Sequence, residues 1–190
     1  MSKLLSGCLF SLAFLGLLLA GESPEASRSA AQKLERITAE MLKPGETVEL
    51  SQTELNSFIK YDYAKEIPEG VRDLEVTLTK DYGVAEAYVD FEKLSAVKNN
   101  ALAALGAKLF NGERKMRARC RFVSAEGQGK VEVEKVELDG QPLPDFLVEF
   151  LIASTVQQHL ADFEPGEPFP LENNLRQIRL EPANVVVISR

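Results

Sequence analysis

Three segments in which apolar and polar residues alternate constrain the fold of this chain most strongly. Each segment contains two alternating stretches separated by a short turn, and together they cover residues 71–91, 114–138 and 175–188. Alternation with a period of two indicates half-buried strands, and short turns join such strands as antiparallel hairpins. The sequence therefore predicts a largely antiparallel sheet built from three hairpins.

Helical patterns lie between and before the hairpins. The sequence Ser23-Pro24-Glu25 provides an N-cap, a first-turn proline and an acid near the positive helix end, which predicts a helix over 24–42. Thr47 to Leu50 is predicted as a short strand, and Ser51 with Glu54 forms a capping box for a second helix. Two further helices are predicted over 97–109 and from Pro144 to about Leu160. This order of elements indicates an α+β class.

The predicted helix near the C-terminus has more apolar surface than one packing face needs. Its apolar residues lie on three neighbouring rows, so it is expected to be buried on most sides or to face something apolar. The last strand, Val185 to Ile188, is apolar on both faces. We expect a strongly curved antiparallel sheet of hairpins wrapping this long apolar C-terminal helix, with additional N-terminal helices. Either the helix fills the interior, or helix and sheet line a cavity.

The N-terminus has the parts of a secretory signal peptide. Lys3 precedes an uncharged apolar stretch from Leu4 to Gly21 that ends in small residues. The alternative is an uncleaved anchor, because the stretch is about the minimum length that spans a bilayer. We therefore expect residues 1–21 to be a signal peptide or anchor, and residues 22–190 to be a single α+β domain in the periplasm or cell envelope.

The charge and the residue types argue against several functions. A net charge of −7 disfavours nucleic acid as a partner and adsorption to anionic lipid. His159 is the only histidine, and no nucleophile motif accompanies it, so no catalytic residues are predicted. The pairs Asp90/Glu92 and Glu132/Glu134 are interpreted as the wet face of a sheet, and neither a metal site nor a cofactor is expected. An enzyme would need such acids clustered in a cleft.

An arginine stripe and a cysteine share one predicted strand. Arg117, Arg119 and Arg121 alternate with Cys120 and its apolar neighbours. The stripe has two interpretations: it grips a phosphate or an acidic partner, or it pairs with glutamates of the neighbouring strand. Cys120 is predicted to be a buried, inert thiol on the opposite face.

The order of elements resembles a known group of proteins. Leu50-Ser-Gln-Thr-Glu-Leu-Asn56 follows an N-terminal helix, and the hairpins, an apolar helix, Pro-Phe-Pro-Leu171 and Val-Val-Val-Ile188 come after it. This order is similar to that of the YceB-like bacterial envelope proteins, which resemble the tubular lipid-binding (TULIP-like) fold. The chain departs from the lipoprotein pattern, because no cysteine follows the signal. The resemblance implies a binding protein, not an enzyme.

These observations lead to one functional hypothesis and one alternative. We expect a non-enzymatic extracytoplasmic protein that binds a lipid or another apolar ligand in a groove between sheet and helix, with membrane association only through an uncleaved N-terminal segment. The alternative is an envelope interaction or assembly factor with a fully packed core and no ligand. The residues expected to line the groove are large and apolar: Phe58, Met116, Phe122, Phe146, Leu147, Phe150 and Leu151.

Overall fold

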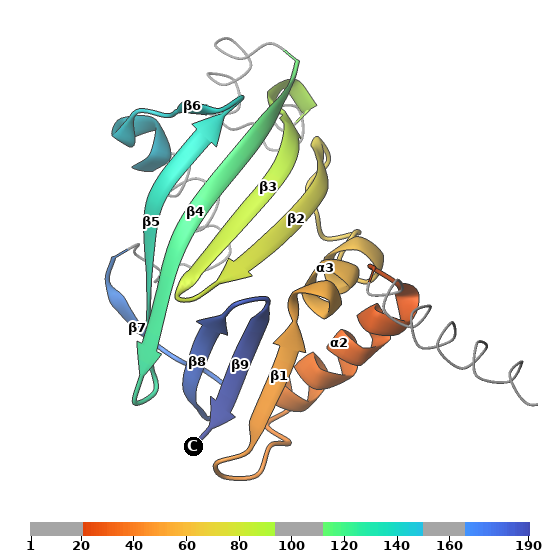
Figure 1. The fold of residues 1–190 in the computed structure, drawn as a ribbon, viewed down its shortest axis with the longest axis vertical. Helices are drawn as coiled ribbons and strands as arrows, with labels where there is room; N and C mark the ends of the chain where they lie inside the picture. The colour runs from red at the N-terminus through yellow and green to blue at the C-terminus, as the bar shows by residue number, and fades with distance from the viewer. Residues whose placement is uncertain (1–20, 94–111, 150–165) are drawn as a thin grey trace, which may run out of the picture.

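The computed structural model describes residues 21–93, 112–149 and 166–190, and 48% of these residues lie in strands. The strands form two antiparallel sheets, which Figure 1 shows one above the other. The smaller sheet has the order β1-β9-β8, and the larger has the order β2-β3-β4-β5-β6, with β7 paired to β5. The elements are α2 Pro24–Thr38, β1 Thr47–Ser51, α3 Gln52–Tyr61, β2 Val71–Thr79, β3 Tyr82–Asp90, β4 Glu113–Ala125, β5 Gln128–Leu138, β6 Gln141–Pro142, β7 Pro168–Pro170, β8 Leu175–Glu181 and β9 Asn184–Ser189.

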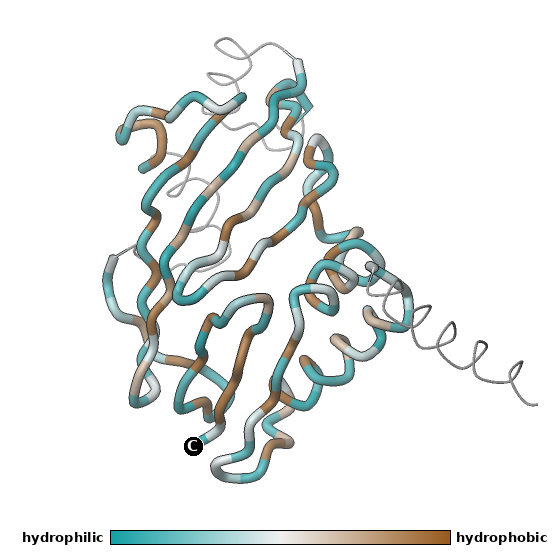
Figure 2. The backbone as a smooth tube through the Cα atoms, in the orientation of Figure 1, coloured by the Kyte–Doolittle hydropathy of each residue, from teal (hydrophilic) through white to brown (hydrophobic). Residues whose placement is uncertain are grey.

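The smaller sheet packs its apolar residues against α2. Val48 and Leu50 of β1 and Val187 of β9 are buried in one cluster with Ala30 and Ile37 of α2. Strand β9 lies between β1 and β8 and is a continuous hydrophobic stretch in Figure 2. Because Val187 and its neighbour Val186 point to opposite faces and are both buried, both faces of this strand are covered, in agreement with its apolar residues on both faces.

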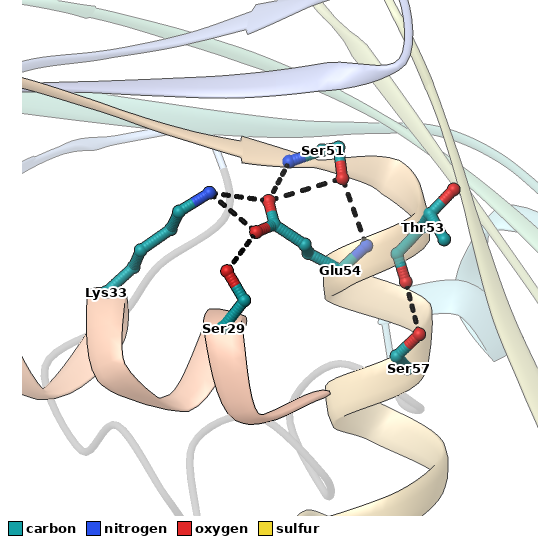
Figure 3. A network of polar contacts seen from close by, with 6 residues as sticks. All are labelled: Ser29, Lys33, Ser51, Thr53, Glu54 and Ser57. Atoms are coloured by element: carbon teal, nitrogen blue, oxygen red, sulfur yellow. Dashed lines mark hydrogen bonds and ion pairs between the residues drawn. The ribbon is translucent and has the colours of Figure 1, made fainter. Parts of the chain in front are cut away.

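Helices α2 and α3 are joined by the carboxylate of Glu54 (Figure 3). It completes the predicted capping box with Ser51 and also accepts hydrogen bonds from Ser29 Oγ at 2.6 Å and from Lys33 Nζ at 2.6 and 2.7 Å. Partial burial alone would raise its pKa, but the hydrogen bonds from Lys33, Ser29 and the Ser51 backbone outweigh this effect and lower the pKa to about 2. Glu54 therefore stays ionised and ties the helix pair together.

Helix α2 is shorter than the sequence suggested, ending at Thr38 instead of near residue 42. Glu40 adopts a left-handed φ of 53°, and the N–H of Met41 donates back to the carbonyl of Arg36. This closing turn satisfies helix-end carbonyls and stops the helix before Pro44 is reached.

All three predicted hairpins are present. In the larger sheet β2 pairs with β3 and β4 with β5, and in the smaller sheet β8 pairs with β9. A β-bulge interrupts β2 between Arg72 and Glu75, where Asp73 has a φ of 52°. A second irregularity lies in the β4–β5 pair between Arg119 and Cys120.

Hydrogen bonds connect the two sheets. The Oγ of Ser124 on β4 donates to the carbonyl of Ile178 on β8 and accepts from the N–H of the same residue at 2.7 Å. The N–H of Ala183, in the β8–β9 turn, donates to the carbonyl of Leu78 at the end of β2. One serine side chain and one turn therefore dock the terminal hairpin against the larger sheet.

The predicted arrangement of one strongly curved sheet around a long apolar C-terminal helix is wrong. Neither described sheet is strongly curled, and the described residues include no long apolar C-terminal helix. Helix is described there only for residues 145–149, and the remainder of the predicted segment lies outside the described residues. The strands instead form two sheets: β1, a single strand between two helices, pairs with β9, so the terminal hairpin belongs to the smaller sheet. The predicted helix at 97–109 also lies outside the described residues.

Candidate functional site

The larger sheet has one face that is apolar across four strands. Its register places Val76, Ala85, Ala118 and Val136 in one row across β2, β3, β4 and β5. Neighbouring rows continue the same composition, and we call this side the apolar face. It is formed by Val76, Leu78, Gly83, Ala85, Ala87, Met116, Ala118, Cys120, Phe122, Val131, Val133, Val136 and Leu138.

The middle of the apolar face is lined by small side chains. Gly83 and Ala85 of β3 lie opposite Cys120 and Ala118 of β4, and all four residues are half-buried. Leu78, Val136 and Leu138 at the margins are buried. The middle of the face therefore presents short side chains and no charged group, which suits contact with an apolar molecule.

Cys120 lies on this face, as predicted from the alternation. Burial and, to a lesser extent, the nearby charge of Glu134 raise the pKa of its thiol. A raised pKa leaves the thiol protonated at neutral pH, and a protonated thiol is a poor nucleophile. Cys120 is therefore interpreted as a packing residue and not as a nucleophile.

The opposite side of the larger sheet, which we call the charged face, carries the arginine stripe. Arg117 Nε lies 3.5 Å from Glu86 Oε1 of β3, Arg119 Nε lies 3.2 Å from Glu134 Oε2 of β5, and Arg121 Nη1 lies 3.9 Å from Glu132 Oε2 of β5. Each arginine thus has a carboxylate on a neighbouring strand. This geometry supports the interpretation of the stripe as a cross-strand salt ladder.

Tyrosines on β3 extend the charged face. The guanidinium of Arg119 lies over the ring of Tyr82, and that of Arg72 lies over the ring of Tyr88, each with 4.2 Å from Cζ to the ring centroid. Arg72 also pairs with both oxygens of Glu113. These contacts hold the arginine side chains flat against the sheet.

The structure separates the residues that were expected to line a groove. Phe58 of α3 and Phe122 of β4 pack against the core of the smaller sheet, and the Phe58 ring stacks on Tyr63 with centroids 6.2 Å apart. Met116 packs against a different cluster, which contains Ala87, Val89, Phe91 and Leu138.

The remaining predicted lining residues lie in and beyond residues 145–149. Phe146 is 66% exposed and Leu147 is half-buried, whereas Phe150 and Leu151 lie outside the described residues. Of the predicted residues that the structure describes, Met116 and Phe122 belong to the apolar face.

Sequence reasoning passed over Arg114 and the small residues of the sheet. Arg114 is in phase with Met116, Ala118, Cys120 and Phe122, and its register partner is Val89. A basic residue at an apolar position of an alternating strand is the signal that could have identified it. Small side chains were overlooked because the search for a lining considered only large apolar residues.

A concave region lies at the edge of the larger sheet. This cleft of about 590 Å³ runs between the end of α3 and the first half of β2, with Ile59, Ile67 and Leu74 among its lining residues. Its two basic residues already have partners, because Lys60 pairs with Glu22 and Arg72 with Glu113. The cleft offers mixed polar and apolar walls.

The acid pairs considered for catalysis have structural roles. Asp90 Oδ1 accepts hydrogen bonds from the N–H groups of Glu92 and Lys93, both at 3.1 Å, and so caps the turn after β3. Glu132 and Glu134 belong to the salt ladder. The described ranges contain no group of three or more residues suited to hold a metal ion, and His159 lies outside them.

Neither a membrane-spanning helix nor a known relative identifies the function of the described residues. No helix within the described parts of the chain has the length and apolar character needed to cross a membrane. No protein-family model and no curated protein matches the sequence. The resemblance to YceB-like and TULIP-like proteins therefore stays a prediction.

Proposed function

We propose that this chain is an exported, non-enzymatic protein that binds a lipid or another apolar ligand on the apolar face of its larger sheet. The observation that carries the proposal is the half-buried group of small residues Gly83, Ala85, Ala118 and Cys120, in a sheet whose other side is a salt ladder. The site differs from the groove predicted around a long helix, because the sheet alone supplies it.

The chemistry of the apolar face suits an aliphatic chain. Burial of a methylene group stabilises a complex by about 0.8 kcal/mol, so several methylenes suffice for measurable affinity. The face has one side chain with a weak polar group, the Cys120 thiol, so an apolar ligand leaves few hydrogen bonds unmade. A ligand seated there would replace water over the small residues.

A binding assay on the purified full chain tests the proposal. Organic extracts are examined by mass spectrometry for copurified lipid, and a fluorescent fatty acid is titrated into delipidated protein. An Ala118→Phe variant covers the small side chains with a ring and should weaken probe binding by about tenfold or more. The matched control is Val84→Phe, which adds the same ring to the neighbouring strand on the charged face and should leave binding unchanged.

Thermal unfolding of the same variants separates ligand binding from the alternative of an assembly factor. If the apolar face is closed core, Ala118→Phe overpacks it and lowers the midpoint strongly, as large-for-small substitutions do. No probe binding and no copurified lipid would then contradict the proposal. An unchanged midpoint with weakened probe binding supports it.

A further inference from the structure

Arg114 stands at one end of the apolar face. It is the second residue of β4, and the alternation of the strand places it on the same side as Met116 and Ala118. Its register partner is Val89, which is 2% exposed and belongs to the same apolar cluster as Ala87 and Leu138. A permanently charged group therefore stands at the end of the apolar face, with Met116 between it and Ala118.

The hydrogen bonds of Arg114 occupy only part of its guanidinium. Nη1 donates to Asp139 Oδ2 at 3.0 Å, and Asp139 is itself fixed because its Oδ1 accepts the N–H of Lys115 at 3.0 Å. Nε is buried and has no acceptor in the described part of the chain. The side chain as a whole is 41% exposed, whereas Nε itself is buried.

The arginines on the other side of the same strand differ from Arg114. Arg117, Arg119 and Arg121 each lie beside a glutamate of a neighbouring strand on the charged face. In Arg114 the carboxylate of Asp139 binds Nη1. The edge of the guanidinium group formed by Nε and Nη2 is not used by this contact. That edge matches the two oxygens of a carboxylate or phosphate.

We propose that Arg114 binds the oxyanion of an amphiphilic ligand whose aliphatic tail lies along the apolar face. This inference rests on the proposed function and specifies its ligand class: a single-chain lipid with a terminal carboxylate or phosphate. The oxyanion accepts hydrogen bonds from Nε and Nη2, and the tail runs from Met116 past Ala118 and Ala85. The ligand thereby gives the buried Nε an acceptor.

The test compares three ligands with the same tail. Laurate, dodecanol and dodecyl phosphate each compete with a fluorescent fatty acid for the full-length, delipidated protein. The variants are Arg114→Met, which removes the donors, and Arg114→Lys, which keeps the charge but loses the side-on fork. Arg121→Met is the matched control on the charged face. Circular dichroism and thermal midpoints establish that each variant is folded.

The expected result is a headgroup preference that depends on Arg114. Wild type should bind laurate or dodecyl phosphate about tenfold or more tightly than dodecanol, which is the range for hydrogen bonds to charged groups. Arg114→Met should abolish the preference and keep the affinity for dodecanol, Arg114→Lys should retain part of it, and Arg121→Met should retain all of it. The anion that binds wild type more tightly, laurate or dodecyl phosphate, identifies the headgroup.

Two outcomes would overturn the inference in different ways. Equal affinity of wild type for all three ligands would refute the role of Arg114 and leave apolar binding intact. Equal losses in Arg114→Met and Arg121→Met would also refute it, because they would reflect overall charge. If no ligand binds to wild type at all, the proposed function itself fails.

Discussion

The side chain of Asn56 pairs with the backbone of Val76 as a neighbouring strand would. Its Nδ2 donates to the Val76 carbonyl at 2.9 Å, and its Oδ1 accepts the Val76 N–H at 2.8 Å. Asn56 lies on α3 and is 4% exposed, whereas Val76 lies on β2, the edge strand of the larger sheet. One amide thus covers part of an edge that would otherwise present free backbone groups.

Removal of this amide should destabilise the whole chain. Asn56→Ala leaves the N–H and carbonyl of Val76 without partners, and each unsatisfied buried group costs about 1 to 3 kcal/mol. We expect the free energy of unfolding, measured by urea denaturation, to fall by at least about 2 kcal/mol. Tyr61→Ala, an exposed change on the same helix, is the control. A loss no larger than that of the control would show that water replaces the amide.

The local elements of this fold were predictable, because their signals are local. Alternation in residues 71–79 identifies a strand, and Ser51 followed by Glu54 identifies a helix start. The division into two sheets was not predictable, because a period of two shows that a strand has a buried face and not which strand lies beside it. Asn56 illustrates the difficulty: in the sequence it is a polar helix residue, and in the structure it replaces a strand.

The candidate site was only partly predictable for a similar reason. Met116 and Phe122 were correctly placed on one side of β4, because their alternation is unambiguous. Phe58 was expected on the same surface, but it packs against the core of the smaller sheet, since α3 follows β1 directly. Which face becomes covered depends on long-range docking, such as the hydrogen bonds of Ser124 with Ile178.

The stability of the helix pair should depend on pH through Glu54. Its pKa is about 2 in the folded protein, against 4.5 as the ordinary value. A lowered pKa contributes stability that is complete above pH 4.5 and is lost as the pH falls towards 2. Discounted for solvent screening, we expect Glu54→Gln to cost about 1 to 2 kcal/mol at pH 7.

The measurement is urea denaturation of Glu54→Gln and wild type at several pH values. The difference between the two proteins should shrink as the pH is lowered from 5 towards 2. Glu35→Gln, an exposed change on α2, should show no such trend. A difference that stays constant with pH would mean that the carboxylate charge of Glu54 does not stabilise the fold.

Gly127 is a position where any side chain should be costly. Its φ is +78°, and a Cβ there would lie 1.9 Å from Nη2 of Arg190, the last residue of the chain. The left-handed conformation costs an alanine roughly 1 to 2 kcal/mol. We expect Gly127→Ala to lower the free energy of unfolding by about this amount.

The double variant Gly127→Ala/Arg190→Ala separates backbone strain from the clash. The guanidinium is the flexible end of its side chain, so it can move away from an added methyl group. Gly127→Ala should therefore lower the free energy of unfolding nearly as much in the Arg190→Ala background as in wild type. Full recovery in a double-mutant cycle by thermal unfolding would show that the clash, and not the backbone, makes the substitution unfavourable.

Cys120 should react slowly with thiol reagents in the folded protein. Burial, and then the charge of Glu134, raises the pKa of its thiol, so little thiolate is present near neutral pH. In a Cys8→Ser variant, which leaves Cys120 as the single cysteine, labelling by iodoacetamide at pH 8 should be much slower than labelling in urea. Equal rates in the two states would contradict a protected thiol.

The salt ladder of the charged face should contribute little stability, and its contribution should depend on the Arg119–Tyr82 contact. Exposed ion pairs such as Arg119 with Glu134 are worth about 0.2 to 1 kcal/mol, and an exposed cation–π contact about 0.5 to 1 kcal/mol. A double-mutant cycle of Arg119→Met and Tyr82→Ala should therefore give a coupling energy of about 0.5 to 1 kcal/mol. A second cycle, of Arg119→Met and Glu134→Gln, measures the ion pair, and its coupling energy should fall when the salt concentration is raised, because added ions screen exposed charges. Coupling energies near zero in both cycles would leave Arg119 without a structural role, and would reopen the interpretation of the arginine stripe as a surface that grips a phosphate or an acidic partner.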